Sequence, residues 1–402
     1  MRSSFFSFFN SNGAGENLFF EGEEDKLELA ITDDNALPRL DEFIARHAGS
    51  FIFLALSYEL YSETESSLAL PKGDYDFPKL LAMVPKRVGD VDLKSYKISS
   101  RWGEKFDGDE LLSTSIPAFP TQKKLELKKR FSRTSYLEKA QKLLEAIQRG
   151  DLYELNFCQE FFADQVDIDP WETYQQLNTK TQAPYSACVK LGDKWILSAS
   201  PELYLQKSGP QLISSPIKGT IPRANKALED LENSRILQSS IKEQSENVMI
   251  VDLVRNDLSK VAKKGTVHVP ELFAVKSFKT VHHLVSTVQA ELRNEVSFVE
   301  ILRASFPMGS MTGAPKISAI KHAQLAEEFP RGIYSGSLGY IKPNGDFSLN
   351  VVIRSIIFDQ NRKKLSFKTG SALTARCNPE LEYEECLVKA NALISSLNGK
   401  LV

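Results

Sequence analysis

Apolar and polar positions alternate in short runs along much of the chain, which is the pattern of strands with one buried face. Two pairs of runs form hairpins, one turning at Ser208-Gly209-Pro210 and the other at Pro343-Asn344-Gly345-Asp346. Because the strands follow one another through turns and do not alternate strictly with helices, we expect an α+β fold with largely antiparallel sheets. Further strands are predicted over residues 51–60, 152–162, 185–191, 195–198, 280–291 and in a run ending at Leu373.

Helical periodicity predicts several helices between these strands. A capping box of Ser135 and Glu138 begins a helix that Gly150 ends. In the stretch 309–316 we expect Pro315 in the first turn of a helix, where its missing N–H costs no hydrogen bond. The helix that begins near Ser135 has an apolar stripe of Leu137, Ala140, Leu144 and Ile147. Three other helices are predicted, over 226–254, from the capping box of Ser297 and Glu300 to near Pro307, and over 380–397.

Composition narrows the class of protein. The 402 residues are 42% apolar, enough for a large core, and the charges nearly cancel at −2. This balance gives no electrostatic argument for a nucleic acid or an anionic membrane as partner. The four scattered cysteines fit neither a disulfide framework nor a zinc site. Without a signal-peptide core or an apolar run of about 18 residues, we predict a soluble, cytoplasmic protein with no membrane span.

The hairpin within residues 198–223 carries an acid and an amine, Glu202 and Lys218, on its two arms. A hairpin can hold such a pair on opposite sides of a small cavity. The alternative is an ordinary surface hairpin with two solvated charges, which is the commoner case for an arbitrary hairpin.

Two predicted helices carry glutamates at matched spacing, Glu243 with Glu246 and Glu382 with Glu385, so each pair shares a helix face. Like charges this close need water or a cation, and Mg²⁺ accepts carboxylate oxygens while keeping positions for an anionic substrate. The alternative for either pair is a solvated face. The apolar run 247–254 that follows the first pair favours a buried helix whose glutamates face a site.

Two further features are able to bind an anion, and a histidine is a third candidate for the site. The G-S-M-T-G-A-P-K stretch places Thr312 and small residues at a helix start, although routine capping is an alternative. Arg354 lies in an apolar run, 351–357, that predicts a buried strand, where its guanidinium needs a carboxylate partner from a ligand or from the protein. His283 is by pattern alone more typical of a satisfied strand histidine than of a catalytic one.

At this point the sequence resembles the chorismate-utilising enzymes, a family that includes anthranilate, aminodeoxychorismate, isochorismate and salicylate synthases. The resemblance covers roughly residues 130–397. It implies one large α+β domain of two packed sheets flanked by helices, with residues 1–125 as a poorly matched part of the same fold and residues 126–400 as the chorismate-binding catalytic region. The matching segments are Ser200-Pro201-Glu202, P-I-K-G-T at 216–220, K-E-Q-S-E-N-V-M-I-V-D-L-V-R-N-D-L at 242–258, H-L-V-S at 283–286, F-P-M-G-S-M-T-G-A-P-K at 306–316, Y-S-G-S-L-G-Y at 334–340, G-D-F-S-L-N-V-V-I-R at 345–354 and P-E-L-E-Y-E-E at 379–385.

The resemblance also implies roles for individual residues. Glu202 matches the general acid near the departing C4 hydroxyl of chorismate. The positions implied to hold Mg²⁺ are Glu243, Glu246, Glu382 and Glu385. Those implied to contact the substrate carboxylates are Tyr334, Arg354, Lys389 and the loop from Gly370 to Ala372, and those implied to line the cavity are Thr220, His283 and Thr312.

Lys218 implies the subfamily, because aminodeoxychorismate synthases carry P-I-K-G-T where anthranilate synthases carry P-I-A-G-T. There the lysine adds to C2 of chorismate, and ammonia from a glutaminase partner then gives 4-amino-4-deoxychorismate, a precursor of p-aminobenzoate and folate. We expect desolvation to lower the pKa of Lys218. Glu154 stands where water-adding relatives carry a lysine. The alternatives are anthranilate synthase component I with an unusual lysine and a non-catalytic chorismate-binding regulator.

Overall fold

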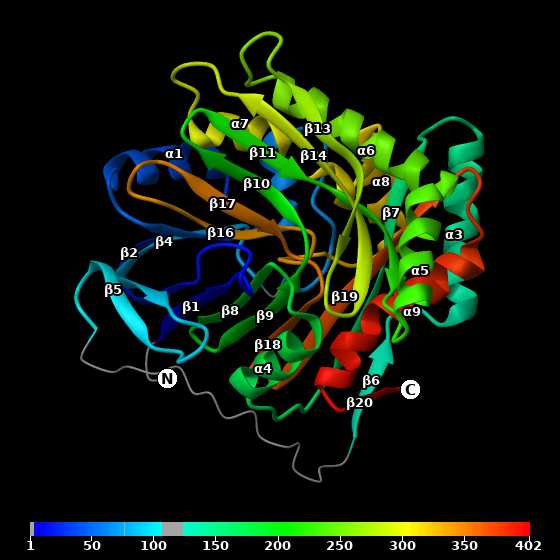
Figure 1. The fold of residues 1–402 in the computed structure, drawn as a ribbon, viewed down its shortest axis with the longest axis horizontal. Helices are drawn as coiled ribbons and strands as arrows, with labels where there is room; N and C mark the ends of the chain where they lie inside the picture. The colour runs from blue at the N-terminus through cyan, green and yellow to red at the C-terminus, as the bar shows by residue number, and fades with distance from the viewer. Residues whose placement is uncertain (1–3, 76, 107–123) are drawn as a thin grey trace.

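The alternating runs form strands that pair edge to edge in one long ladder, as Figure 1 shows for the computed structural model, which describes residues 4–75, 77–106 and 124–402. The order along the ladder is β6-β7-β19-β18-β9-β8-β1-β2-β4-β3-β16-β17-β10-β11-β14, and β12 and β13 both pair with β14. These pairings are all antiparallel, which confirms the expected α+β class with largely antiparallel strands.

The strands have the following bounds: β1 Phe5–Asn10, β2 Leu18–Leu29, β3 Ile52–Leu56, β4 Leu80–Val91, β5 Ile98–Gly103, β6 Leu125–Lys129, β7 Glu154–Ala163, β8 Tyr185–Leu191, β9 Lys194–Ser200, β10 Leu203–Ser208, β11 Gln211–Ser215, β12 Ile217–Pro222, β13 His268–Ser277, β14 Val281–Glu291, β15 Gly313–Ala314, β16 Ser337–Ile341, β17 Phe347–Val351, β18 Ser355–Asp359, β19 Lys364–Thr374 and β20 Gly399–Leu401. Both predicted hairpin turns are confirmed, between β10 and β11 and between β16 and β17. Three further strands lie beside the ladder, with β5 antiparallel to β4, β15 antiparallel to β7 and β20 parallel to β6.

The ladder bends so that two of its parts face each other across an aromatic core. Phe5 and Phe9 of β1 pack with Phe53 of β3, and Leu338 of β16 and Ile196 of β9 belong to the same buried cluster. Strands from the first hundred residues therefore form part of the same layers as strands from the last hundred. Because the rings of β1 and β3 are shielded from water on both sides, this core stabilises the arrangement through apolar burial.

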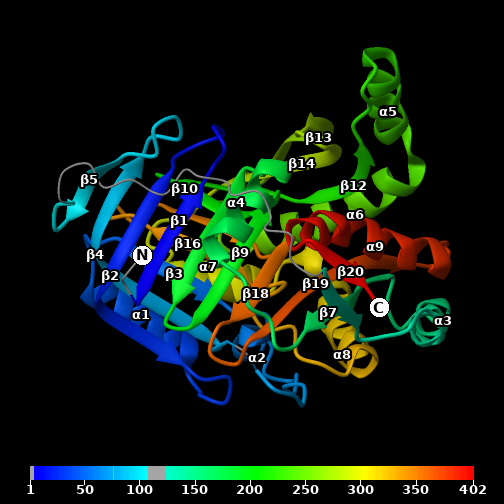
Figure 2. The same ribbon diagram turned by 90° about the horizontal axis from the view of Figure 1, so that it is seen from below.

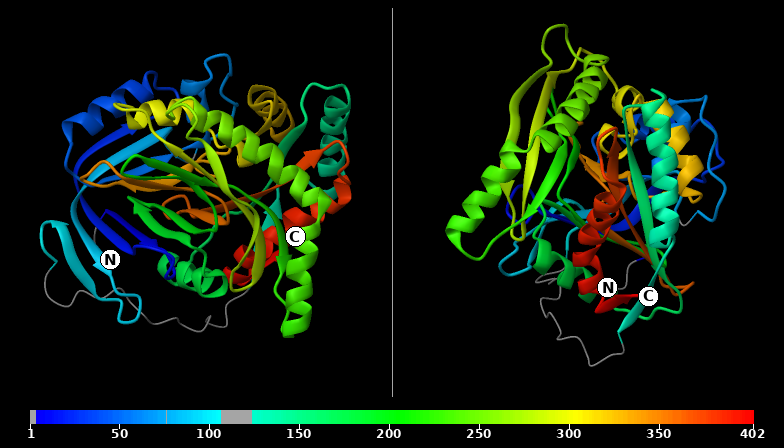
Figure 3. Two further views of the ribbon diagram at one scale, coloured as in Figure 1. Left: turned by 45° about the horizontal axis from the view of Figure 1, so that its top comes forward. Right: turned by 90° about the vertical axis from the view of Figure 1, so that its right-hand side faces the viewer.

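Helices cover the outer faces of the two layers (Figure 3). Leu177 of α4 and Leu393 of α9 pack with Phe367 of β19 on one face, while α1, α3, α7 and α8 supply a second buried cluster. Helix α5 instead projects from the body of the molecule (Figure 2). The helices are α1 Ala36–Arg46, α2 Tyr61–Thr64, α3 Arg133–Gln148, α4 Pro170–Thr181, α5 Ala227–Ser239, α6 Ile241–Ser259, α7 Phe298–Ser305, α8 Lys316–Glu327 and α9 Pro379–Ser396.

Two helix boundaries differ from the sequence prediction, and one agrees with it. Helix α3 begins after Ser132, whose side chain accepts from the Ser135 N–H, so the predicted capping box at Ser135 is wrong. The single helix predicted over 226–254 is broken at Ser240, which adopts an extended conformation and caps α6 by accepting from the Glu243 N–H. The capping box at Ser297, by contrast, is confirmed. The break at Ser240 separates the projecting helix α5 from α6, the helix that carries Glu243 and Glu246.

The stretch 309–316 is not one helix start. A 3₁₀ turn at Gly309–Met311 leads into β15, and α8 begins only at Lys316, so Pro315 is the N-cap and not a first-turn residue. The residue before a proline is pushed towards extended conformations, which favours the strand at that point. Gly313 has φ +145, and a Cβ there would lie 2.0 Å from the Glu154 carbonyl oxygen, so the close approach of β15 to β7 requires glycine.

Candidate active site

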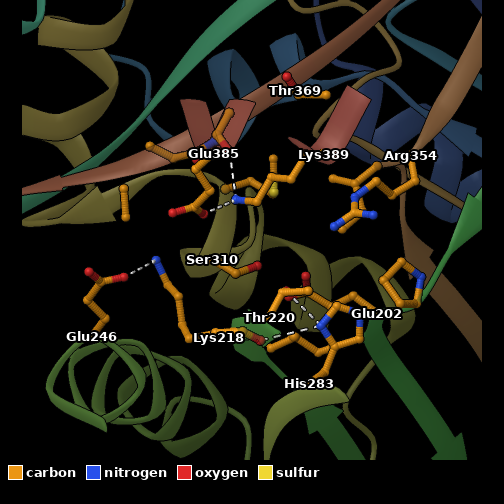
Figure 4. A pocket seen from close by; sticks show the side chains of 18 of the residues that line it. Glu202, Lys218, Thr220, Glu246, His283, Ser310, Arg354, Thr369, Glu385 and Lys389 are labelled. Carbon is orange, nitrogen blue, oxygen red and sulfur yellow. Dashed lines mark hydrogen bonds and ion pairs between the residues drawn. The ribbon is translucent and has the colours of Figure 1, made fainter. Parts of the chain in front are cut away.

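Strands and helices from widely separated parts of the sequence surround one cavity (Figure 4). Its walls are formed by residues of β12, β14, β19, α6 and α9, together with the 3₁₀ turn at Gly309–Met311 and the connection between β17 and β18. The predicted site residues that line it are Glu202, Lys218, Thr220, Glu243, Glu246, His283, Tyr334, Arg354, Gly370, Ala372, Glu385 and Lys389.

Two predicted site residues, Thr312 and Glu382, do not line the cavity. Thr312 is buried, and its hydroxyl donates to backbone carbonyls of its own turn, at 3.2 Å to Met308. Glu382 is 1% exposed and accepts hydrogen bonds from Lys242 and Ser371. Both side chains therefore lie behind the lining and are engaged by the protein itself.

Lys218 reaches the cavity from β12 at an irregularity in the strand. The pairing register with β14 shifts between Lys218 and Thr220, and the intervening Gly219 has φ +78. A Cβ on Gly219 would lie 2.9 Å from Glu243 Oε2 on α6. The glycine thus lets the strand bulge and lets the glutamate approach, which brings β12 and α6 together beside Lys218.

The Lys218 ammonium is held by two carboxylates. It donates a short hydrogen bond to Glu154 Oε1, and Glu246 Oε2 lies 4.0 Å away. Burial by itself disfavours the charged amine, but Glu154 and Glu246 outweigh it and raise the pKa of Lys218 above its ordinary value. The prediction that desolvation would lower this pKa is therefore wrong, because it did not include the two carboxylates.

Glu202 lies just before β10 and is 4% exposed. Burial raises the pKa of Glu202 to about 7, and hydrogen bonds from the Ser310 side chain and the Ile217 backbone oppose this only in part. A carboxyl group with such a pKa keeps a large protonated fraction near neutral pH, which is the property required of a general acid.

Cationic and neutral side chains form another part of the lining. Arg354 has a left-handed backbone conformation, with φ +52, in the connection between β17 and β18, so the strand predicted over 351–357 is interrupted at this residue. Among the described residues, no carboxylate lies within ion-pair distance of Arg354. Lys389, in contrast, donates to the Gly370 carbonyl at 2.8 Å and pairs with Glu385 at 2.7 Å. The Arg354 guanidinium is thus available to a ligand carboxylate.

His283 faces the cavity as a neutral group. Burial, with the nearby Arg354, lowers the pKa of His283 to about 3, so the ring carries no charge near neutral pH. Its Nδ1 lies 2.9 Å from the Thr220 hydroxyl. The ring is thereby fixed in orientation and adds a polar, uncharged surface to the site.

An acidic wall formed by Glu243, Glu246 and Glu385 has the donor chemistry that Mg²⁺ prefers. Oε1 of Glu246 is buried and has no hydrogen-bond partner in the part of the chain that the structure describes, which leaves an oxygen available to a cation. Within 4–75, 77–106 and 124–402, no three acidic, histidine or cysteine side chains are grouped closely enough to hold a metal by themselves. One or two carboxylates with water and substrate oxygens suffice for Mg²⁺, so the donor set fits this ion.

Sequence reasoning missed three residues that shape the site. Glu154 pairs with Lys218, Ser310 lines the cavity beside Glu202, and Lys242 lies between Glu246 and Glu382. In the sequence, Glu154 is noted only because water-adding relatives carry a lysine at that position. None of the three carries a local signal for its partner, because each partner comes from another element of the fold.

Comparison with known proteins places the chain in a family. A profile of the chorismate binding enzymes matches residues 5–395. Aminodeoxychorismate synthase component 1 of Salmonella typhimurium is 39% identical over 268 residues, which are 67% of this chain and 58% of that protein. Anthranilate synthase component 1 of Thermus thermophilus is 31% identical over 353 residues, which are 85% of this chain and 76% of that protein.

A solved structure shares the fold. Anthranilate synthase component I of Streptococcus pneumoniae superposes with a TM-score of 0.79 at 24% identity, covering 94% of this chain and 91% of that one. This likeness supports the fold alone. The match of the family profile to residues 5–395, nearly the whole chain, shows that the chain belongs to the chorismate binding enzyme family.

Proposed function

We propose that this protein aminates chorismate to 4-amino-4-deoxychorismate, as the component 1 type of aminodeoxychorismate synthase, with Lys218 as a covalent nucleophile and Glu202 as general acid. The observation that carries the proposal is that an amine and a protonatable carboxyl group line the same cavity as Arg354. These are the groups needed to displace a hydroxyl from an anionic substrate. The chain matches only 58% of the length of the Salmonella relative, so that relative's name supports the activity without establishing it.

In the first step the Lys218 amine, after giving its extra proton to a neighbouring carboxylate, forms a bond to C2 of chorismate. The two conjugated double bonds of the ring each shift by one position, the C4–O bond breaks, and Glu202 donates the proton that lets the hydroxyl leave as water. Since hydroxide is a poor leaving group, the raised pKa of Glu202, about 7, favours this role.

In the second step ammonia forms a bond to C4 and loses a proton, both ring double bonds shift back, and the bond between C2 and Lys218 breaks. The lysine regains a proton, and the sum of the two steps is chorismate plus ammonia giving 4-amino-4-deoxychorismate plus water. Both steps use the same nitrogen, so Lys218 has to remain close to C2 throughout.

The remaining lining residues orient the substrate. Arg354 would grip a substrate carboxylate with its two parallel N–H groups, and the neutral His283 and Thr220 would contact uncharged oxygens. Glu243, Glu246 and Glu385 would hold Mg²⁺, which would neutralise the second carboxylate and stabilise charge pushed into the ring. Tyr334 and Lys389 complete the side of the cavity next to Gly370.

The ammonia is proposed to come from a separate glutaminase subunit. The product would then serve a lyase that makes p-aminobenzoate for folate synthesis. Cytoplasmic location is supported by four free cysteines and by the finding that none of the described helices is long and apolar enough to span a membrane.

Anthranilate synthase is the second candidate, favoured by the Thermus relative that matches 85% of this chain. Purified protein with chorismate, Mg²⁺ and ammonium salt, followed by chromatography, separates the two. We expect 4-amino-4-deoxychorismate, and anthranilate as the main product would overturn the proposal. No turnover, even with a glutaminase present, would support a non-catalytic regulator.

The covalent step is tested by intact mass spectrometry without ammonia. We expect the wild-type chain to gain the mass of chorismate less one water, and Lys218→Met to gain nothing while still binding chorismate. Methionine keeps most of the apolar length of the lysine side chain, so loss of the adduct reports the amine and not a change of packing. If the wild-type chain forms product but never an adduct under these conditions, the covalent role of Lys218 is wrong.

A further inference from the structure

Glu154 is a buried carboxylate in contact with the proposed nucleophile but absent from the cavity lining. It is 1% exposed, and its Oε1 accepts from the Lys218 ammonium. Its other oxygen, Oε2, is buried and has no hydrogen-bond partner among the described residues. A half-satisfied buried carboxylate is costly, and it is retained here next to a lysine that has a second carboxylate, Glu246, only 4.0 Å away.

The backbone around Glu154 is held from two sides. On one side β15 pairs with β7, with the Tyr153 N–H donating to the Ala314 carbonyl at 2.7 Å, and the Asn156 N–H donates to the Thr312 carbonyl at 2.8 Å. On the other side Glu154 is opposite Thr374 of β19. The first residue of β7 is therefore fixed between two strands, and its short side chain has little freedom to move.

Lys218 is held less firmly by its own strand. It precedes the bulge at Gly219, and its ammonium is at the end of a flexible four-carbon side chain. Glu246, the second carboxylate within reach, lies on α6 at 4.0 Å and so contributes a weaker contact. Of the two carboxylates, Glu154 is the one that can define the position of the Lys218 nitrogen.

We propose that Glu154 is a positioning residue, which fixes the Lys218 nitrogen at the cavity so that the covalent step depends on a carboxylate outside the lining. This inference rests on the proposed function, in which that nitrogen bonds C2 of chorismate. Without Glu154, the ammonium would move towards Glu246 and away from the place that Glu154 defines. Small displacements of a reacting atom can reduce a rate by about 100-fold.

The test compares Glu154→Leu, which removes the acceptor, with Glu154→Gln, which keeps the shape and one acceptor oxygen. We expect adduct formation, followed by rapid-quench intact mass, to slow about 100-fold in the leucine variant and less in the glutamine variant. Chorismate affinity, measured by calorimetry, should stay within about threefold, because no cavity-lining residue changes. Adduct formation at the wild-type rate in Glu154→Leu would overturn the inference.

A matched control removes a buried ion pair that does not line the cavity. Glu63 pairs with Lys79 at 3.2 Å, and the side chains are 13% and 3% exposed. Glu63→Gln should lose stability without slowing the adduct. If Glu63→Gln slows it as much as Glu154→Leu does, the effect is general destabilisation and the inference fails.

A second readout does not depend on the proposed reaction. A small imidoester labels lysine amines, and peptide mass spectrometry gives the rate at Lys218 alone. We expect slow labelling in the wild-type chain, where the nitrogen is engaged by Glu154, and labelling at least about tenfold faster in Glu154→Leu, because the amine loses the carboxylate that holds its proton. Equal rates would overturn the positioning role. A third outcome separates the two proposals. If the wild-type chain makes no adduct, while Lys218 is labelled faster in Glu154→Leu than in the wild-type chain, the covalent chemistry is wrong and the positioning role stands.

Discussion

The Lys242 ammonium lies 2.8 Å from Glu382 Oε1, so a carboxylate that the sequence predicts as a metal ligand is bound to a lysine. Glu382 is 2% exposed at its side chain, and the same lysine lies 3.9 Å from the otherwise unpartnered Oε1 of Glu246. In this arrangement an internal cation pairs with Glu382 behind the cavity lining and lies close to Glu246 of the acidic wall, and a divalent cation would compete with it.

Lys242→Met is therefore expected to bind Mg²⁺ more tightly than the wild-type chain, by about tenfold, because the competing ammonium is gone. The variant should also be less stable without Mg²⁺, by roughly 1 kcal/mol, since the lysine is partly exposed and its pairing is screened by water. Calorimetric titration with MgCl₂ and thermal unfolding with and without the ion would measure both effects. Unchanged affinity would show that Lys242 does not compete for the site.

Arg354 should control substrate affinity, because no carboxylate of the described residues lies within ion-pair distance of its guanidinium. Arg354→Met is expected to lower kcat/KM by about 100-fold, and Arg354→Lys by less, since lysine keeps the charge but cannot form two parallel hydrogen bonds. Steady-state kinetics with varied chorismate would show the loss mainly in KM. A change in kcat alone would place Arg354 in the chemical step and contradict a binding role.

The pKa of Glu202, about 7, predicts the alkaline limb of the pH profile. Glu202 has to be protonated to act as an acid, so kcat/KM should fall about tenfold per pH unit above roughly pH 7 if this group alone limits the rate. Glu202→Gln cannot donate a carboxyl proton and should lose this limb together with most of its activity. A wild-type profile that stays flat to pH 9 would exclude Glu202 as the acid.

Glu59 predicts a separate dependence of stability on pH. It is 0% exposed, accepts from the Arg331 and Gly332 N–H groups, and has its pKa raised by burial from 4.5 to about 7. Between pH 4.5 and about 7 the folded state therefore retains a proton that the unfolded state has lost. The contribution of Glu59 to the free energy of unfolding is then complete below pH 4.5 and is lost as the pH rises through 7. Urea unfolding measures the free energy of unfolding at pH 5 and at pH 8. Between these two pH values it should fall less in Glu59→Gln than in the wild-type chain.

The sequence by itself determined the class of fold and most of the cavity lining. Period-two runs and turn residues such as those at 208–210 and 343–346 are local signals, so they predict hairpins without knowledge of the tertiary structure. The motifs around Glu202, Lys218 and Arg354 likewise identified residues that line one cavity.

The tertiary structure alone decided which charges meet. Lys218 and Glu154 are 64 positions apart, and Lys242 and Glu382 are 140 apart, so their pairing depends on strand register and helix packing that no local pattern encodes. For the same reason the sequence predicted the wrong direction for the pKa of Lys218. Burial could be inferred from composition, but the sign of the shift is set by two carboxylates that only the folded chain brings to the amine.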